Sequence, residues 1–185
     1  MPTRARLLFA LLLPGGCLAA AAEPAPPPER PLFRLLGSAD GLPSSTVHRL
    51  AQDRAGNLWL ATLDGLARYD GHAFRVWRHD PDDPHGLPGN DVQQVLVDPE
   101  DQVWLSVNDA GVARYRPDRD GFERWRHQPG RPDSLPGDRI WALAPDGAGG
   151  IWLGGFGTGL ARLKRDGAIT RYQALAMPGG DPCPL

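Results

Sequence analysis

Cysteine is scarce in this sequence, with only Cys17 and Cys183 among 185 residues. We expect Cys17 to leave with a cleaved leader, so the mature chain has one cysteine and forms no intramolecular disulfide. Positive charge is not in excess either, because 20 Lys and Arg stand against 22 Asp and Glu. Without residues 1–22 the balance is 18 against 22, which excludes the basic footprint of a nucleic-acid-binding protein.

A hydrophobic run long enough to cross a membrane is also missing at the N-terminus. The apolar run at residues 7–13 is too short, since a spanning helix needs about 20 residues. Arg4 and Arg6 precede this run, and the small residues 19–22 follow it. This order is typical of a secretory signal peptide, here residues 1–22 with cleavage after Ala22, and it predicts a periplasmic or secreted protein.

Two alternatives to cleavage after Ala22 remain for this leader. It could stay uncleaved as a membrane helix, or it could be lipidated at Cys17. Pro14 argues against lipidation, because it occupies the position where a lipoprotein signal usually has an aliphatic residue. The proline-rich residues 23–31 are expected to form an extended linker after the leader.

Glycine and proline, by contrast, are abundant, with 23 and 20 residues. Frequent turns of this kind favour many short strands over long helices. The 41% hydrophobic and 23% charged content is that of a soluble globular protein. Composition therefore predicts an all-β fold.

Three similar segments follow one another along the chain, starting at residues 41, 86 and 134 with Gly-Leu-Pro or Ser-Leu-Pro. In each copy an aspartate precedes a tryptophan by six residues, and a glycine then opens a short run ending in tyrosine or leucine. These landmarks are Asp53, Trp59, Gly65 and Tyr69; Asp98, Trp104, Gly111 and Tyr115; and Asp146, Trp152, Gly159 and Leu163. Aromatic or aliphatic pairs close the copies, namely Phe74 and Trp77, Phe122 and Trp125, and Ile169 and Tyr172.

Each copy reads as four short strands separated by turn residues; in the first copy these are 47–52, 58–62, 66–69 and 73–78. A four-stranded repeat of 40 to 50 residues has the size of one β-propeller blade. We therefore predict three antiparallel blades, at residues 41–85, 86–133 and 134–172. The repeated tryptophans are expected to pack between blades, since one twisted sheet cannot bury both faces alone; carbohydrate stacking is the weaker interpretation.

These motifs resemble the two-component regulator propeller repeats in the periplasmic sensor regions of bacterial hybrid histidine kinases and related diguanylate cyclases. The shared pattern is Gly-Leu-(Pro/Ser), then Asp-x-x-Gly-x-(aliphatic)-Trp, then Gly-(Leu/Val)-x-x-Tyr. Four departures are Asp101 for a turn glycine, Ser134 for the leading glycine, an extra residue before Gly111, and Leu163 for the tyrosine. The resemblance implies propellers of about seven blades, an immunoglobulin-like segment, a membrane helix and a cytoplasmic signalling module.

Three blades fall short of the four to eight that close a propeller. We therefore interpret residues 32–172 as a partial propeller. Residues 31–36 match the last strand of a blade, and we expect this additional N-terminal outer strand to complete a blade whose other strands later sequence contributes. The tail at residues 173–185 has no blade pattern, and we interpret it as a truncated or frameshifted end.

No motif for catalysis, cofactor or metal stands out, so we predict none of the three. The glycine-rich residues 154–159 fit no phosphate-binding spacing and fall between the second and third strands of their copy. The acidic group Asp80, Asp82 and Asp83 could offer oxygen ligands to calcium, but the second copy does not repeat it. His79 and His127 occupy matching places in the repeat, which indicates a shared structural role or simple descent from a common repeat.

A ligand site, if present, is expected on the face where the loops entering the first strands meet those joining the second and third strands. The residues in these loops differ between the three copies, whereas the packing residues do not. A binding site built on the repeat would show this pattern, but so would loops whose sequence is free to vary. The candidates are His48, Asp64, Asn108, Asp109, Trp141 and Phe156.

Three functions compete. The first is a sensor that binds a small molecule or a carbohydrate and, within a full-length receptor anchored in the inner membrane, signals across it; this chain by itself is then not an enzyme. The second is an enzyme, since related propellers resemble metal-assisted streptogramin lyases. The third is a structural or interaction remnant, with self-association through open blade edges.

Overall fold

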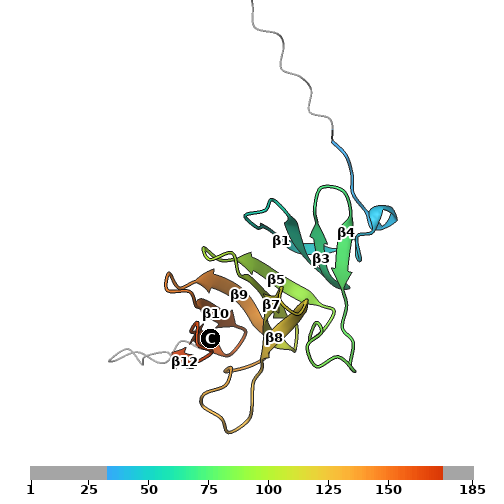
Figure 1. The fold of residues 1–185 in the computed structure, drawn as a ribbon. Coiled ribbons are helices and arrows are strands. Elements are labelled where there is room, and N and C mark those ends of the chain that lie inside the picture. The colour runs from blue at the N-terminus through green and yellow to red at the C-terminus, as the bar shows by residue number, and fades with distance from the viewer. Residues whose placement is uncertain (1–32, 173–185) are drawn as a thin grey trace, which may run out of the picture. The chain divides into compact units, whose positions relative to one another are not determined.

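Strands account for almost all regular structure in the computed structural model, which describes residues 33–172. They form three antiparallel sheets of four, and within each sheet the strands pair in sequence order (Figure 1). Blade 1 comprises β1 (Val47–Gln52), β2 (Leu58–Thr62), β3 (Gly65–Tyr69) and β4 (Phe74–Trp77). Blade 2 comprises β5 (Val92–Val97), β6 (Val103–Val107), β7 (Gly111–Arg116) and β8 (Gly121–Trp125). Blade 3 comprises β9 (Ile140–Pro145), β10 (Ile151–Gly155), β11 (Gly159–Leu163) and β12 (Ile169–Tyr172).

The predicted all-β fold of three four-stranded blades is confirmed. A short 3-10 turn, η1 (Ser38–Asp40), precedes blade 1, and no helix among residues 33–172 is long and apolar enough to cross a membrane. The expected leader at 1–22, the linker at 23–31 and the tail at 173–185 lie outside the described residues.

The outer strand expected at residues 31–36 was to pair with a blade contributed by later sequence, and without that blade its described part does not form a strand. Residues 33–37 have no strand structure, and Leu35 is exposed. The physical reason is the lack of a partner. A strand is held by hydrogen bonds to a neighbour, and the twelve strands of blades 1 to 3 all pair within their own four-stranded sheets.

The aspartate six residues before each tryptophan builds the first hairpin turn of its blade. In blade 1, Asp53 accepts a hydrogen bond from the backbone N–H of Asn57 at 2.9 Å and another from the Trp59 indole at 2.9 Å. Asp98 does the same for Gln102 and Trp104, both at 2.8 Å. The spacing in the motif therefore has a cause: one carboxylate closes the turn and orients the buried ring.

Blade 3 uses the same aspartate differently. Asp146 still accepts from the backbone N–H of Gly150 at 2.8 Å, but its second oxygen accepts from Arg162 at 2.8 Å instead of from Trp152. Burial acts to raise the pKa of Asp146, yet the N–H groups of Ala148 and Gly150 and the Arg162 guanidinium outweigh it and hold the pKa below its ordinary 3.8.

These turn carboxylates predict a loss of stability in acid. Burial acts to raise the pKa of Asp53, but hydrogen bonds from Asn57 and Trp59 lower it below 3.8 overall. A carboxyl whose folded pKa is depressed stabilises the fold fully above its unfolded pKa of about 3.9 and loses that contribution as pH falls through the folded value. The melting temperature, followed by circular dichroism, should therefore fall steeply from about pH 4 downward.

The matched variants are Asp53→Asn and Asp146→Asn, which keep a side-chain oxygen but cannot be protonated in this range. Each should lower the melting temperature at pH 7 and flatten its fall in acid, because one linked proton is lost. A double variant that keeps the full wild-type slope between pH 5 and 3 would contradict the assignment.

The hydrophobic core lies between the blades. The face of a blade that meets the following blade is called its forward face here, and the opposite face its rear face. Trp59, Ala61 and Leu66 on the forward face of blade 1 form one buried cluster with the rear face of blade 2. The forward face of blade 2 packs in the same way on blade 3, in a cluster that includes Trp104 and Leu153. All three blades belong to one compact unit that starts at Leu35.

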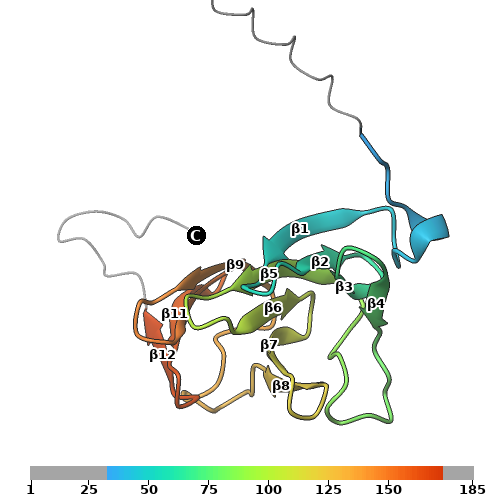
Figure 2. The ribbon, with the colours of Figure 1, turned by 45° about the horizontal axis from the view of Figure 1, so that its top comes forward.

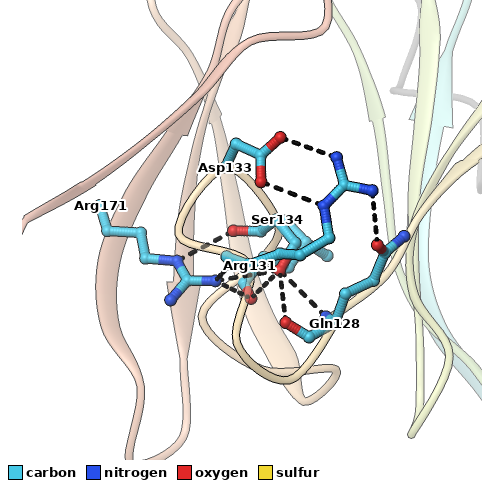
Figure 3. A network of polar contacts seen from close by, with 6 residues as sticks. Gln128, Arg131, Asp133, Ser134 and Arg171 are labelled. Atoms are coloured by element: carbon cyan, nitrogen blue, oxygen red, sulfur yellow. Dashed lines mark hydrogen bonds and ion pairs between the residues drawn. The ribbon is translucent and has the colours of Figure 1, made fainter.

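A network of hydrogen bonds holds the loop before blade 3 in place and explains why serine can replace the motif glycine at position 134 (Figure 3). The guanidinium of Arg171, on β12, donates to the carbonyl oxygens of Arg131, Ser134 and Leu135 at 2.8 to 2.9 Å. The Ser134 hydroxyl also accepts from the backbone N–H of Gln128 at 3.0 Å. The departure from glycine at Ser134 therefore adds hydrogen bonds and leaves the fold of the blade unchanged.

Candidate functional site: the loop face

Each blade has a β-bulge at the same place, near the start of its first strand. The pairing of first and second strands skips one residue between Val47 and Arg49, between Val92 and Gln94, and between Ile140 and Ala142. The unpaired residues are His48, Gln93 and Trp141. A bulge re-aims the side chain of its extra residue and often lies next to a functional site. β1, β5 and β9 contact one another in turn (Figure 2), so the three bulges lie on neighbouring strands.

His48 is held by the neighbouring blade. Its Nδ1 atom lies 2.9 Å from the carbonyl oxygen of Val92 and 3.8 Å from a carboxylate oxygen of Asp91. A carbonyl oxygen only accepts, so Nδ1 donates to it, and Nε2 is the acceptor atom of the neutral ring. Asp91 also accepts from the Gln93 side chain at 2.6 Å, which links the first two bulges.

The loops between second and third strands supply the other predicted residues, and arginines neutralise their carboxylates. Asp64 accepts from Arg78 at 3.2 Å within blade 1. Asp109, in a left-handed turn with φ of 53°, accepts from Arg139 of blade 3 at 2.7 Å. This hydrogen bond from Arg139 raises the pKa of the guanidinium. Asn108 is half-buried, and its backbone N–H donates to the backbone carbonyl oxygen of Asp91 at 2.9 Å.

Two aromatic side chains lie together on blade 3. Trp141 is 56% exposed and Phe156 is 74% exposed, and both line a groove of about 510 Å³. The remaining lining residues are small or aliphatic, namely Ala142, Gly154, Gly155, Gly159 and Leu160. This groove offers flat apolar surface at its rim, where a ring or a sugar face can stack.

The structure therefore divides the six predicted residues into three groups. Trp141 and Phe156 share the groove, and His48 occupies a bulge equivalent to that of Trp141. Asp64 and Asp109 are engaged with arginines, and Asn108 supports the loop through its backbone. We call the surface formed by the three bulges and these loops the loop face.

Gln93 is the residue that sequence reasoning missed. It stands 45 residues after His48 and 48 before Trp141, the same spacings that separate the three repeats. The repeat register contained this signal, but glutamine is chemically unremarkable on a strand. Two predicted structural histidines are confirmed: His79 and His127 each place Nδ1 2.7 Å from the carbonyl oxygen of the leucine eight residues on.

A second cavity, of about 430 Å³, lies where the turns of blades 2 and 3 meet and is polar in character. Arg114, Arg116 and Arg165 line it together with Glu100 and Asp118. Arg116 donates to Asp118 at 3.2 Å, so part of this charge is already paired. Residues 33–172 hold no group of three His, Cys, Asp or Glu side chains placed to bind a metal ion.

Comparison with known sequences gives a family and a relative. The two component regulator propeller family matches residues 41–64 and 134–157, which open blades 1 and 3. Histidine kinase P4 of Formosa agariphila is 42% identical over 52 residues, which are 28% of this chain and 4% of that protein.

Among solved structures, the extracellular domain of a hybrid two component system from B. thetaiotaomicron is similar, with a TM-score of 0.71 and 27% identity. The match covers 80% of this chain and 21% of that one, so this chain spans about a fifth of its length. Virginiamycin B lyase from Staphylococcus aureus has a TM-score of 0.54 at 13% identity, over 70% of this chain and 41% of the lyase. At that identity the likeness concerns the fold alone.

Proposed function

We propose that this chain, which is similar to the two component regulator propeller family and to an extracellular domain of a hybrid two component system, is a ligand-sensing part of such a receptor. In this proposal the chain works outside the cytoplasm, binds its ligand on the loop face and performs no catalysis itself. Phosphotransfer or cyclase chemistry belongs to a signalling module elsewhere in the receptor.

The observation that carries the proposal is the threefold bulge. Packing between blades explains the repeated tryptophans. It does not explain why all three blades have a bulge at the same position, or why the bulged side chain is an imidazole in blade 1, an amide in blade 2 and an indole in blade 3. Binding sites are commonly built in this way, from side chains that vary at equivalent positions of a rigid scaffold.

The chemistry of the loop face favours a neutral, polyhydroxylated ligand such as an oligosaccharide. Asp64 and Asp109 each pair with an arginine, so little net charge is left to attract an ion. Trp141 offers an exposed ring for stacking, and His48 and Gln93 offer hydrogen-bonding groups at the equivalent bulges of blades 1 and 2. The lyase alternative rests on fold likeness only, and fold does not imply function.

The test is calorimetric titration with neutral oligosaccharides, maltoheptaose and laminarihexaose, alongside a heparin hexasaccharide as the anionic comparison. We expect saturable binding of a neutral probe, weakened about 5- to 30-fold by Trp141→Ala and by Gln93→Ala, since a lost stacking or hydrogen-bonding contact removes about 1 to 2 kcal/mol.

Arg165→Ala, in the second cavity, is the matched control and should leave the affinity unchanged. If heparin binds and the neutral probes do not, the ligand class is wrong. If Arg165→Ala removes binding and Trp141→Ala does not, the loop face is not the site.

A further inference from the structure

The second cavity has a smaller counterpart between blades 1 and 2. Turns that join first to second strands and third to fourth strands help to line both of them, at the strand ends opposite the loop face. The counterpart has a volume of about 170 Å³, against about 430 Å³ for the second cavity. Each lies between two blades that the structure describes, so the two can be compared position by position.

Two replacements in blade 3 change the size and the charge of the second cavity. Asp101 of blade 2 lines the counterpart, and the equivalent residue of blade 3 on the second cavity is Gly149. Pro117 of blade 2 also lines the counterpart, and its equivalent in blade 3 is Arg165. The second cavity has therefore lost a carboxylate side chain and gained a guanidinium.

Most of the other charges on the second cavity already have partners. Arg114 donates to Glu123 at 2.6 Å, and its guanidinium lies 5.1 Å from the centroid of the Trp104 ring. Arg116 donates to Asp118 at 3.2 Å and to Glu123 at 3.4 Å. These arginines and acids balance one another, so they leave little charge for a ligand.

Arg165 and Glu100 are the charged side chains of this lining that have no partner among residues 33–172. Both are exposed, and they come from opposite sides of the interface, Arg165 from blade 3 and Glu100 from blade 2. The backbone N–H of Glu100 donates to the Asp98 carboxylate at 3.0 Å, which fixes the turn and leaves the Glu100 carboxylate available. The lining therefore offers one cation and one anion.

Neither of these two charges is a feature of the repeat. Arg165 stands where the other copies have glycine or proline, and Glu100 stands where they have alanine. The equivalent residues are Gly71, Pro117, Ala55 and Ala148. Packing and turn formation do not require the two charges, because the other blades form the same turns without them.

We propose that the second cavity binds a small zwitterion, a molecule with one carboxylate and one ammonium group such as a free amino acid or a short peptide. The Arg165 guanidinium matches a carboxylate in shape and charge, and the Glu100 carboxylate accepts from an ammonium group. A singly charged ligand would engage only one of the two residues. The volume of about 430 Å³ is in the usual range for small-molecule sites. This site is separate from the loop face, so neither proposal depends on the other.

Titration of the isotope-labelled chain with glycine, β-alanine and triglycine, followed by NMR, tests this site. The three probes carry the same two charges at increasing separation. Two charge-assisted contacts predict a dissociation constant of about a millimolar for the best probe, with saturable shifts at the backbone N–H groups of Gly149 and Arg165. Acetate and methylammonium carry only one charge each and should bind about 10- to 100-fold more weakly.

Arg165→Glu and Glu100→Arg should each weaken zwitterion binding about 10- to 100-fold, because each leaves two like charges on the lining. The double variant has both signs again in exchanged places, so a zwitterion should bind in the reverse orientation. Lys164→Glu is the matched control, since Lys164 is exposed beside Arg165 but does not line the second cavity, and it should leave the affinity unchanged.

Gly149→Asp tests the replacement that distinguishes the second cavity from its counterpart. Blade 2 already has aspartate at this place, where Asp101 has φ of 66° and Gly149 has φ of 82°, so the variant should fold. A Cβ on Gly149 would lie 3.2 Å from Cδ of Arg165, which places the new carboxylate beside the guanidinium. We expect it to pair with Arg165 and to weaken binding about 10- to 100-fold.

Acetate or methylammonium binding as tightly as the zwitterions overturns the proposal, and so does the lack of any shift with each probe at about 10 mM. A double variant that binds no better than the two single variants also overturns it, because the charges would then not act on the ligand. Saturable binding that both single variants weaken and the double variant restores supports it.

Discussion

Trp104→Ala should lower the free energy of unfolding by about 3 to 5 kcal/mol, the range for removing a large aromatic side chain from a core. The Trp104 ring is completely buried between blades 2 and 3 and packs 5.5 Å from the ring of Trp125, with the Arg114 guanidinium 5.1 Å from its centroid. Its indole N–H also donates to Asp98 at 2.8 Å, so the substitution removes a donor from a buried carboxylate. Urea unfolding followed by far-ultraviolet circular dichroism measures the change.

Trp152→Ala is the matched control at the same motif position of blade 3. Trp152 is partly exposed, and residues 33–172 place no further blade against it, so its loss should lower the free energy of unfolding by only about 1 to 2 kcal/mol. Equal losses at the two positions would mean that packing between blades is not the main source of stability.

The fold was readable from the sequence because each repeated residue has a local task. Asp53 and Trp59 stand six apart since the carboxylate must close a turn and still reach the indole, and a sequence pattern records that spacing directly. Asp101, which replaces the turn glycine of this motif, takes the left-handed conformation with φ of 66°. The strand expected at 31–36 stays a prediction, because strand formation depends on a partner and the partner expected for it belongs to later sequence.

The candidate site was readable only in part. Trp141 and Phe156 could be chosen because they stand at loop positions where the three copies differ, and the structure does bring them to one groove. The bulges were not predictable, because one extra unpaired residue hardly changes the pattern of alternating apolar and polar residues in so short a strand. The engagement of Asp109 by Arg139 was also hidden, because it joins side chains 30 residues apart in neighbouring blades.

Gly111→Ala is the second substitution with a large expected effect. Gly111 opens β7 with φ of 81°, where a Cβ costs about 1 to 2 kcal/mol, and the added carbon would also overlap the carbonyl oxygen of Trp125. Relieving that overlap requires a shift of the backbone. The hydrogen bond from the Gly111 N–H to the backbone carbonyl oxygen of Asp138, at 3.1 Å, opposes such a shift. With about 1 to 3 kcal/mol for the overlap, the expected total is about 2 to 5 kcal/mol.

Gly159→Ala separates the two causes, because Gly159 opens the equivalent strand β11 with a similar φ of 71°. There the nearest atom to an added Cβ is the carbonyl oxygen of Tyr172 at 3.5 Å, an ordinary van der Waals contact. Only the conformational cost of about 1 to 2 kcal/mol should remain. If chemical denaturation gives equal losses for Gly111→Ala and Gly159→Ala, the left-handed backbone alone explains the glycine of this motif; a larger loss at Gly111 shows that the glycine is also required for the close approach of the fourth strand.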